Sequence, residues 1–393
     1  MKKKALFPLA ATLLVLASLS APVQAADKVR IGFLTTLSGP GGALGADVRD
    51  GFQLAIAHGG QKLGGLPVEI SIVDDQQNPQ TGRQSVERFL KRDNVDLITG
   101  VVFSNVLLPV LPEILKSDTP YLSTNTGPRD YAGEKCSPNF FALAWQNEDI
   151  PSAMGKFAGE KNYKRVAMIA PNYPGGRESL DGFKRLYKGQ IVEEIYTKLG
   201  QLDFAAELAT IRAAKPDAVF FFLPGGMGVN FIKQFDGAGL NKQMALLAPG
   251  FSADEDTIKA VGDSIVGVYN ASQWAADLDN APNKRFVADF VKTYGRTPTM
   301  YAAQAYDTAL LIDSAVRKVG GKVENATAFR DALKAAQFQS IRGSFRFNTN
   351  QFPIQNLYMR EVVKDASGKV GNRTVGTVLT AHADPFASQC PMK

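Results

Sequence analysis

The sequence predicts an α/β fold with two lobes, each built on a parallel sheet that helices cover on both faces. Strand and helix patterns alternate from Val29 onward, and the alternation starts again after the apolar segment 140–145. Such alternation specifies parallel strands joined by covering helices. The 393 residues also exceed the usual size of one hydrophobic core. We therefore expect two doubly wound lobes.

The N-terminal segment 1–25 has the features of a secretory signal peptide. A basic run at 2–4 precedes the short apolar run 5–19, and small residues at 23–25 form a cleavage pattern. The apolar run is too short for a transmembrane helix, and no later run approaches the ~20 residues needed. We therefore predict a cleaved signal peptide and export to the periplasm.

The first lobe opens with a strand, a glycine-rich turn and an amphipathic helix. Val48, Phe52 and Ala55 lie on one face of that helix. The further expected strands are 68–75, 96–102 and 119–122, and the expected helices are 79–92 and 105–116.

The second lobe repeats this alternation of strands and helices. The expected helices are 150–161, 178–188, 204–214 and 228–239, the expected strands are 165–170, 191–197, 218–223, 244–248 and 265–269, and 172–176 is expected to be a glycine-containing loop. Three helices without intervening strands follow, and we expect them to cover the first lobe. The segments 356–363 and 374–380 predict an antiparallel hairpin. The chain thus crosses between the lobes more than once, which predicts a cleft that closes by a hinge.

Several functional classes fit the sequence poorly. Without the signal lysines the chain has 41 basic and 38 acidic residues and no basic cluster, so we expect no nucleic-acid partner. The glycine-rich turn has Leu44 where a dinucleotide-binding motif needs its third glycine, and Asp74 lies beyond the usual acidic position. We therefore expect no cofactor.

An exported hydrolase is the alternative from another class. The sequence lacks a G-x-S-x-G elbow, and its only histidines are His58 and His382. Asp74 and Asp75 are adjacent on a strand and point to opposite faces, so they are poorly placed to share a site. We expect no metal site and no enzymatic activity.

The two cysteines, Cys136 and Cys390, are expected to form a disulfide. An even number of cysteines in an exported chain favours pairing, which would attach the C-terminal tail to the body. Two free thiols are the alternative, and these would react with a thiol reagent without reductant.

Polar residues follow the predicted strands of the first lobe and should converge on one crevice. Hydroxyl groups together with amides at helix N-termini suit a carboxylate. These residues are Ser38, Ser104, Asn105, Ser123, Thr124, Asn125 and Thr126.

Several segments, in this order, resemble the exported solute-binding proteins of the Leu/Ile/Val-binding family. They are IGFLTTLSGPGGALG, GVVFSN, STNTGPRDY, the loop 172–175 and the stretch 286–316, and the resemblance covers nearly the whole mature chain. It implies a type I periplasmic binding protein fold, with two Rossmann-like lobes and parallel sheets joined by a three-crossover hinge. It also implies permease subunits of an ABC importer as membrane partners, and we expect a monomer. Lobe 1 is then 26–145 plus 275–348, and lobe 2 is 146–274 plus 349–393.

The resemblance also implies a ligand site. A carboxylate is held at the positions matching Ser104, Thr124 and Thr126, and Tyr173 matches a tyrosine that reaches across from the second lobe. Amino-acid binders of the family carry an acid where this chain reads 248–251 without one, and they carry tyrosines at the positions of Leu44 and Leu223. A buried ammonium without a counter-charge is costly. These departures favour a larger ligand without an amine.

We therefore predict capture of a small hydrophobic or aromatic carboxylate of the benzoate or cinnamate type. A branched-chain or other amino acid is the alternative ligand. Further candidates for contact with the ligand are Phe103, Trp145, Phe251, Trp274, Arg177, Gln273 and Gln304.

Overall fold

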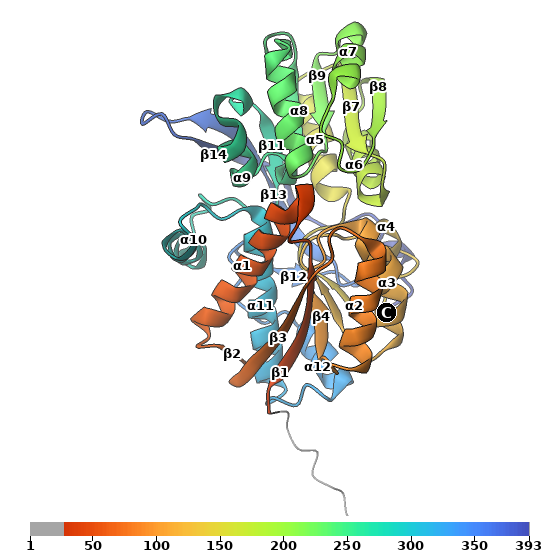
Figure 1. Ribbon diagram of the computed structural model, residues 1–393, viewed down its shortest axis with the longest axis vertical. Helices are drawn as coiled ribbons and strands as arrows, with labels where there is room; N and C mark the ends of the chain where they lie inside the picture. The colour runs from red at the N-terminus through yellow and green to blue at the C-terminus, as the bar shows by residue number, and fades with distance from the viewer. Residues whose placement is uncertain (1–26, 393) are drawn as a thin grey trace, which may run out of the picture.

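The computed structural model describes residues 27–392, which form two α/β lobes arranged along the long axis of the molecule (Figure 1). The expected signal peptide, residues 1–25, lies outside the described residues. Lobe 1 denotes the six-stranded sheet with its covering helices, and lobe 2 denotes the eight-stranded sheet with its helices. Within residues 27–392, no helix is both long and apolar enough to cross a membrane.

The sheet of lobe 1 has the strand order β2-β3-β1-β4-β5-β6. The central strand β1 pairs in parallel with β3, where Val29 lies opposite Val68, and with β4, where Ile31 lies opposite Leu97. The strands of this sheet are β1 (Val29–Thr35), β2 (Lys62–Leu63), β3 (Leu66–Asp74), β4 (Leu97–Thr99), β5 (Tyr121–Ser123) and β6 (Phe140–Ala142).

Helices cover both faces of this sheet. Phe33 of β1 packs on Phe52 of α1, with ring centroids 5.1 Å apart. The neighbouring Gly32 faces the other way, and a side chain there would meet the ring of Phe89 on α2. The helices of this half are α1 (Gly42–His58), α2 (Pro79–Lys91), α3 (Ser104–Lys116) and the short α4 (Arg129–Ala132).

Lobe 2 repeats the architecture around the strand order β12-β13-β11-β10-β9-β7-β8. Its strands are β7 (Arg165–Pro171), β8 (Gln190–Thr197), β9 (Ala218–Phe221), β10 (Ala245–Pro249), β11 (Tyr269–Ser272), β12 (Arg346–Phe347), β13 (Pro353–Lys364) and β14 (Val370–His382). Its helices are α5 (Asp149–Glu160), α6 (Pro174–Leu186), α7 (Ala205–Ala214), α8 (Gly226–Gly237) and α9 (Glu255–Val261).

Three consecutive helices then return toward lobe 1, as the sequence predicts. They are α10 (Ala281–Tyr294), α11 (Met300–Lys318) and α12 (Ala326–Lys334). Helix α11 packs along α1, and the two backbones approach so closely at Gly51 that a Cβ atom there would lie 2.0 Å from the carbonyl oxygen of Ala302. The exact division between lobes given above stays our proposal.

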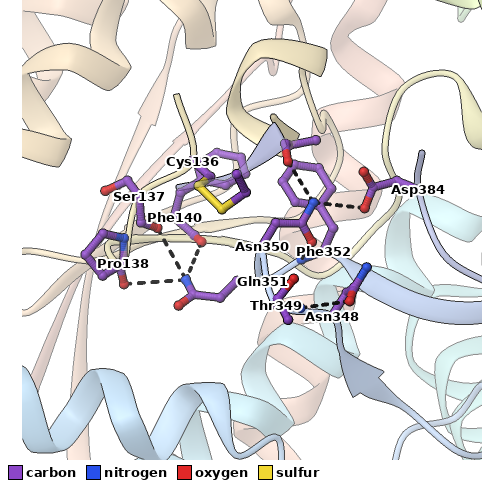
Figure 2. The surroundings of a disulfide bond; sticks show 12 residues. Cys136, Ser137, Pro138, Phe140, Asn348, Thr349, Asn350, Gln351, Phe352 and Asp384 are labelled. Carbon is purple, nitrogen blue, oxygen red and sulfur yellow. Dashed lines mark hydrogen bonds between the residues drawn. A yellow bond between two sulfur atoms is a disulfide. The ribbon is translucent and has the colours of Figure 1, made fainter. Parts of the chain in front are cut away.

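The C-terminal segment forms the predicted antiparallel hairpin of β13 and β14. Beyond it, Cys390 forms the expected disulfide with Cys136 (Figure 2). Asn350 supports the same region, because its amide donates to the carbonyl of Ala132 and to Asp384 at 2.8 and 2.9 Å. The tail is therefore attached to lobe 1 by a covalent bond and by hydrogen bonds.

Two predicted boundaries are wrong in informative ways. The strand expected at 265–269 begins only at Tyr269, because Gly262–Ile265 is a 3-10 turn and Gly267 has a φ of +89°. Helix α6 begins at Pro174, four residues before the expected start, because this proline occupies the first helical position.

Candidate functional site

Both sheets direct their loops toward one crevice. In lobe 1, β1 lies between β3 and β4, so the strand order reverses there. In lobe 2, β7 lies between β8 and β9, which creates a second reversal. The crevice outside the carboxyl ends of the strands at such reversals is the usual ligand site of open α/β sheets. The loops after β4, β5, β7, β9 and β10 all border it here.

A cavity with an empty volume of about 410 Å³, its mouth included, lies in this crevice. Residues of both lobes surround it, which suits a small molecule enclosed between them. The lining residues are Leu44, Val102, Phe103, Ser104, Asn125, Thr126, Trp145, Asn147, Tyr173, Gly175, Ser179, Phe222, Pro224, Phe251 and Tyr301.

The N-termini of α3 and α6 meet at this cavity. Their N-cap residues, Phe103 and Tyr173, are aromatic and provide no side-chain hydrogen bond to the first turn. The backbone N–H of Gly175 donates instead to Oγ of Ser104 across the lobes, at 2.8 Å. The first N–H groups of a helix lack partners within the helix and carry the positive end of its dipole. The cavity therefore presents two anion-attracting helix ends.

Five aromatic side chains follow one another around the cavity. The ring centroids are 6.4 Å apart for Phe103 and Tyr173, and 6.1 Å apart for Tyr173 and Phe222. Phe222 lies edge-on to Phe251 at 5.1 Å, and Phe251 stacks on Trp145 at 5.2 Å. We call these five residues the aromatic collar. Such rings favour a flat apolar ligand, which can pack against a face or an edge.

Two amide side chains on the wall are already engaged with the protein. Asn147 accepts from the backbone N–H of Gly127 and donates to Glu178, at 2.8 and 2.6 Å. Asn125 donates to the carbonyl of Val102 and accepts from Gln304 at 3.1 Å. These amides shape the wall, so polar contacts with a ligand are left to the hydroxyl groups and the helix ends.

No charged side chain is among the residues that line the cavity. Burial raises the pKa of Tyr173 far above its ordinary value, so its phenol stays protonated and can donate a hydrogen bond. Burial also raises the pKa of Glu178, behind the wall, to about 7. A carboxylate would thus meet hydroxyl groups and helix ends, whereas an ammonium would find no carboxylate on the wall.

The structure brings eight of the predicted ligand residues onto the cavity wall. They are Leu44, Phe103, Ser104, Asn125, Thr126, Trp145, Tyr173 and Phe251.

The other predicted ligand residues do not line the cavity. Ser38 is exposed, and Asn105 turns away to donate to the carbonyl of Gln77. Thr124 is fully buried, and Leu223 packs in the core of lobe 2. Arg177 is exposed and lies over the ring of Tyr196. None of these five residues is among those that line the cavity, so their contact with a ligand stays a prediction.

Three further glutamine and tryptophan candidates lie behind the wall. Gln304 supports Asn125 and in turn accepts from Gln273 at 3.1 Å. The indole N–H of Trp274 donates to Asn283 at 2.7 Å, away from the cavity. The two glutamines therefore support the wall through Asn125, whereas Trp274 has no hydrogen bond to a lining residue.

Sequence reasoning missed Val102, Asn147, Gly175, Ser179, Phe222, Pro224 and Tyr301, all of which line the cavity. Pro174 is the sequence signal that would have identified two of them, because proline is favoured at the first helical position and so marks an early start of α6. With Pro174 at the first helical position, Gly175 and Ser179 are four residues apart and share one face of the helix.

The histidines and the paired aspartates have structural partners elsewhere. His58 contacts Tyr306 and Asp289 at 2.8 and 3.1 Å, and His382 contacts Asp149 at 2.9 Å. Neither histidine lines the cavity. Asp74 accepts from the backbone N–H of Leu37, and Asp75 accepts from the hydroxyl of Thr36. The two carboxylates therefore hold the loop that follows β1.

Comparison with known proteins identifies the class. The family model described as Periplasmic binding protein matches residues 28–369. The chain therefore belongs to the periplasmic binding protein family. It is similar to Leu/Ile/Val-binding protein homolog 6 of Brucella melitensis biotype 1, at 26% identity over 378 residues, which cover 94% of this chain and 96% of that protein.

Two solved structures extend the comparison. An ABC-transporter solute-binding protein from R. palustris in complex with benzoate has a TM-score of 0.88 and 30% identity, covering 93% of this chain and 99% of the other. A solute-binding protein from Rhodopseudomonas palustris BisB5 in complex with 3,4-dihydroxy benzoic acid has a TM-score of 0.84 and 29% identity, covering 92% and 99%. The expected two-lobed fold is confirmed, and these relatives are solute-binding proteins.

Proposed function

We propose that the protein is the periplasmic solute-binding component of an ABC importer and that it captures a small aromatic carboxylate of the benzoate or cinnamate type. The ligand would be enclosed in the cavity between the lobes when the hinge closes. Residues 1–25 would direct export and then be removed. The protein would deliver the ligand to permease subunits and carry out no chemical reaction.

The observation that carries this proposal is the uncharged cavity between two helix N-termini. The carboxylate would lie beside the hydroxyl of Ser104 and the amide of Gly175, which are hydrogen-bonded to each other at 2.8 Å, and would accept from the serine hydroxyl and from the first-turn amides of α6. The aromatic collar supplies flat apolar surface on the other sides of the cavity. The benzoate complex of a similar protein supports the same ligand class.

An amino acid is the second candidate ligand, and the names of the Brucella relatives favour it. The cavity wall disfavours it, because none of the lining residues carries a negative charge for an ammonium group. An unpaired charge in such a site costs several kcal/mol. We therefore place the aromatic acid first.

A thermal-shift screen tests the proposal. A ligand at a hundredfold excess over its Kd should stabilise the protein by about 2.7 kcal/mol. We expect stabilisation by benzoate, 4-hydroxybenzoate or coumarate and none by leucine or isoleucine. Stabilisation by leucine alone would overturn the aromatic assignment, and turnover of an ester or amide substrate would overturn the solute-binding role.

A further inference from the structure

A second cavity lies where the chain passes between the lobes, apart from the ligand cavity described above. Its empty volume is about 550 Å³, its mouth included, and it shares no lining residue with the ligand cavity. Gln273 lines it from the connection between β11 and α10, and Arg342 and Arg346 line it from the chain that leads from α12 into β13. Two of the lobe connections therefore border this cavity.

Arg342 has one guanidinium nitrogen without a hydrogen-bond partner. The residue is 7% exposed. Its Nε donates to Asp307 and its Nη1 donates to Gln355, both at 2.8 Å. Its Nη2 is buried and has no acceptor among residues 27–392. Buried polar groups are rarely left without a partner, so this nitrogen needs an acceptor from the cavity that Arg342 lines.

The guanidinium of Arg342 is fixed by the protein around it. It pairs with Asp307, which is fully buried, and it lies over the ring of Phe345 at 4.7 Å. Gln355, which accepts from Arg342, also donates to the carbonyl of Ala144 at 2.8 Å, in the connection between β6 and α5. A donor that is already held in one orientation loses little conformational freedom when it binds a ligand.

The charge on the wall of this cavity is positive. Arg342 and Arg346 are the only charged residues among the described ones that line it. Asp307 neutralises Arg342 but does not line the cavity, and Arg346 on β12 is exposed and adds a second guanidinium. Guanidinium groups match the oxygen atoms of carboxylates and phosphates in geometry and in charge. The cavity therefore suits an anion with oxygen acceptors.

We propose that this cavity is a second binding site, separate from the ligand cavity, and that it binds a small oxyanion. A carboxylate or phosphate group would accept from Nη2 of Arg342 and from the guanidinium of Arg346. The inference does not rest on the proposed function, because no residue of the ligand cavity takes part in it. The bound anion would contact residues of two lobe connections.

The test is isothermal titration calorimetry of the full mature chain with inorganic phosphate and with acetate, in chloride buffers of equal ionic strength. We expect saturable binding, and the anion that binds more tightly shows whether the site prefers a phosphate or a carboxylate group. Arg346→Gln should weaken this binding at least tenfold, because one hydrogen bond from a charged group contributes about tenfold or more in affinity. Arg342→Lys keeps a cation beside Asp307 but lacks the planar fork, so it should weaken binding by a similar factor.

Arg92→Gln is the matched control, because its side chain is 71% exposed and lines neither cavity, and it should retain the binding. Arg346→Gln changes an exposed side chain and decides the test if Arg342→Lys fails to fold. The inference would be overturned if neither anion binds saturably, or if binding survives in Arg346→Gln. Loss of binding in Ser104→Ala would also overturn it, since the anion would then lie in the ligand cavity. Each of these results leaves the proposed function intact.

Discussion

The hydroxyl of Ser104 on lobe 1 and the backbone amide of Gly175 on lobe 2 are joined by a hydrogen bond of 2.8 Å. Each residue lies in the first turn of a helix, and the two helices point their N-termini at the same cavity. In our proposal a carboxylate joins this contact, accepting from the serine hydroxyl and from the first-turn amides of α6. Ligand binding and lobe closure would then depend on the same atoms.

Removal of the lobe 1 hydroxyls should weaken ligand binding. We expect Ser104→Ala combined with Thr126→Ala to lower the affinity for an aromatic acid by at least tenfold, since one hydrogen bond to a charged group contributes about 1.5–3 kcal/mol. Calorimetric titration measures the change. Ser38→Ala, at an exposed position outside the cavity, should leave the affinity unchanged. An unaltered affinity in the double variant would refute the carboxylate position.

Intrinsic fluorescence should report ligand binding through one of the two tryptophans. Trp145 belongs to the aromatic collar, whereas Trp274 is buried against Asn283 behind the wall. We expect an aromatic acid to change the emission of the wild-type protein and of Trp274→Phe, and to leave that of Trp145→Phe unchanged. A response that disappears with Trp274 instead would place the ligand elsewhere.

The pH dependence of stability should contain a contribution from Asp254. This residue is 1% exposed and accepts from the backbone N–H of Thr257 at the start of α9. Burial, and next the neighbouring Asp256, raise the pKa of Asp254 to about 7 in the folded protein. An unfolded chain has an aspartate pKa of about 3.9, so between about pH 4 and 7 the folded state retains a proton that the unfolded state has lost. The free energy of unfolding therefore falls as the pH rises through this window.

Asp254→Asn should remove the contribution of Asp254 to the pH dependence of the free energy of unfolding. It should preserve the N-cap, because asparagine also caps helices well. Relative to this variant, the wild-type protein should lose up to a few kcal/mol between pH 5 and pH 8, at about 1.4 kcal/mol per pKa unit. Denaturant unfolding at the two pH values measures the difference. Asp118→Asn, at a position whose side chain is 91% exposed, serves as the control. Identical pH slopes in wild type and Asp254→Asn would show that Asp254 ionises normally.

Loss of the disulfide should destabilise the protein without changing its ligand affinity. Cys136 and Cys390 are 254 positions apart in the sequence, so the bond closes a long loop and restricts the unfolded chain. We expect Cys136→Ala with Cys390→Ala to lower the free energy of unfolding by about 2–5 kcal/mol. Reductant should produce the same loss in the wild-type protein and none in the double variant. If the double variant also bound the ligand more weakly, the C-terminal tail would contribute to the ligand-binding cleft as well as to stability.

The alternation of strands and helices was enough to predict the two lobes, because each apolar period reports directly on the face that an element buries. The exact boundaries of the elements were harder to predict, because they depend on the backbone conformation of single residues. The strand expected at 265–269 fails at Gly267, whose positive φ places it outside the β region.

The site was predictable only in part, because the loop conformations and helix starts that decide which residues line the cavity are also local backbone effects. Ser104, Thr126 and Tyr173 come within five residues of the ends of β4, β5 and β7, so their place near the sheet edge is visible in the sequence. Ser38 also follows a strand, yet it is exposed on the loop that Asp74 holds. Ser179 lies inside a helix, and its relation to Gly175 depends on where that helix begins.

The most direct test is a crystal structure of the mature protein with benzoate bound. We predict that the carboxylate lies within about 3.2 Å of Ser104 Oγ and of a first-turn amide of α6, with the ring inside the aromatic collar. A carboxylate that lies at Ser179, or a benzoate that lies outside this cavity, would contradict the central claim that the two helix N-termini form the anion site.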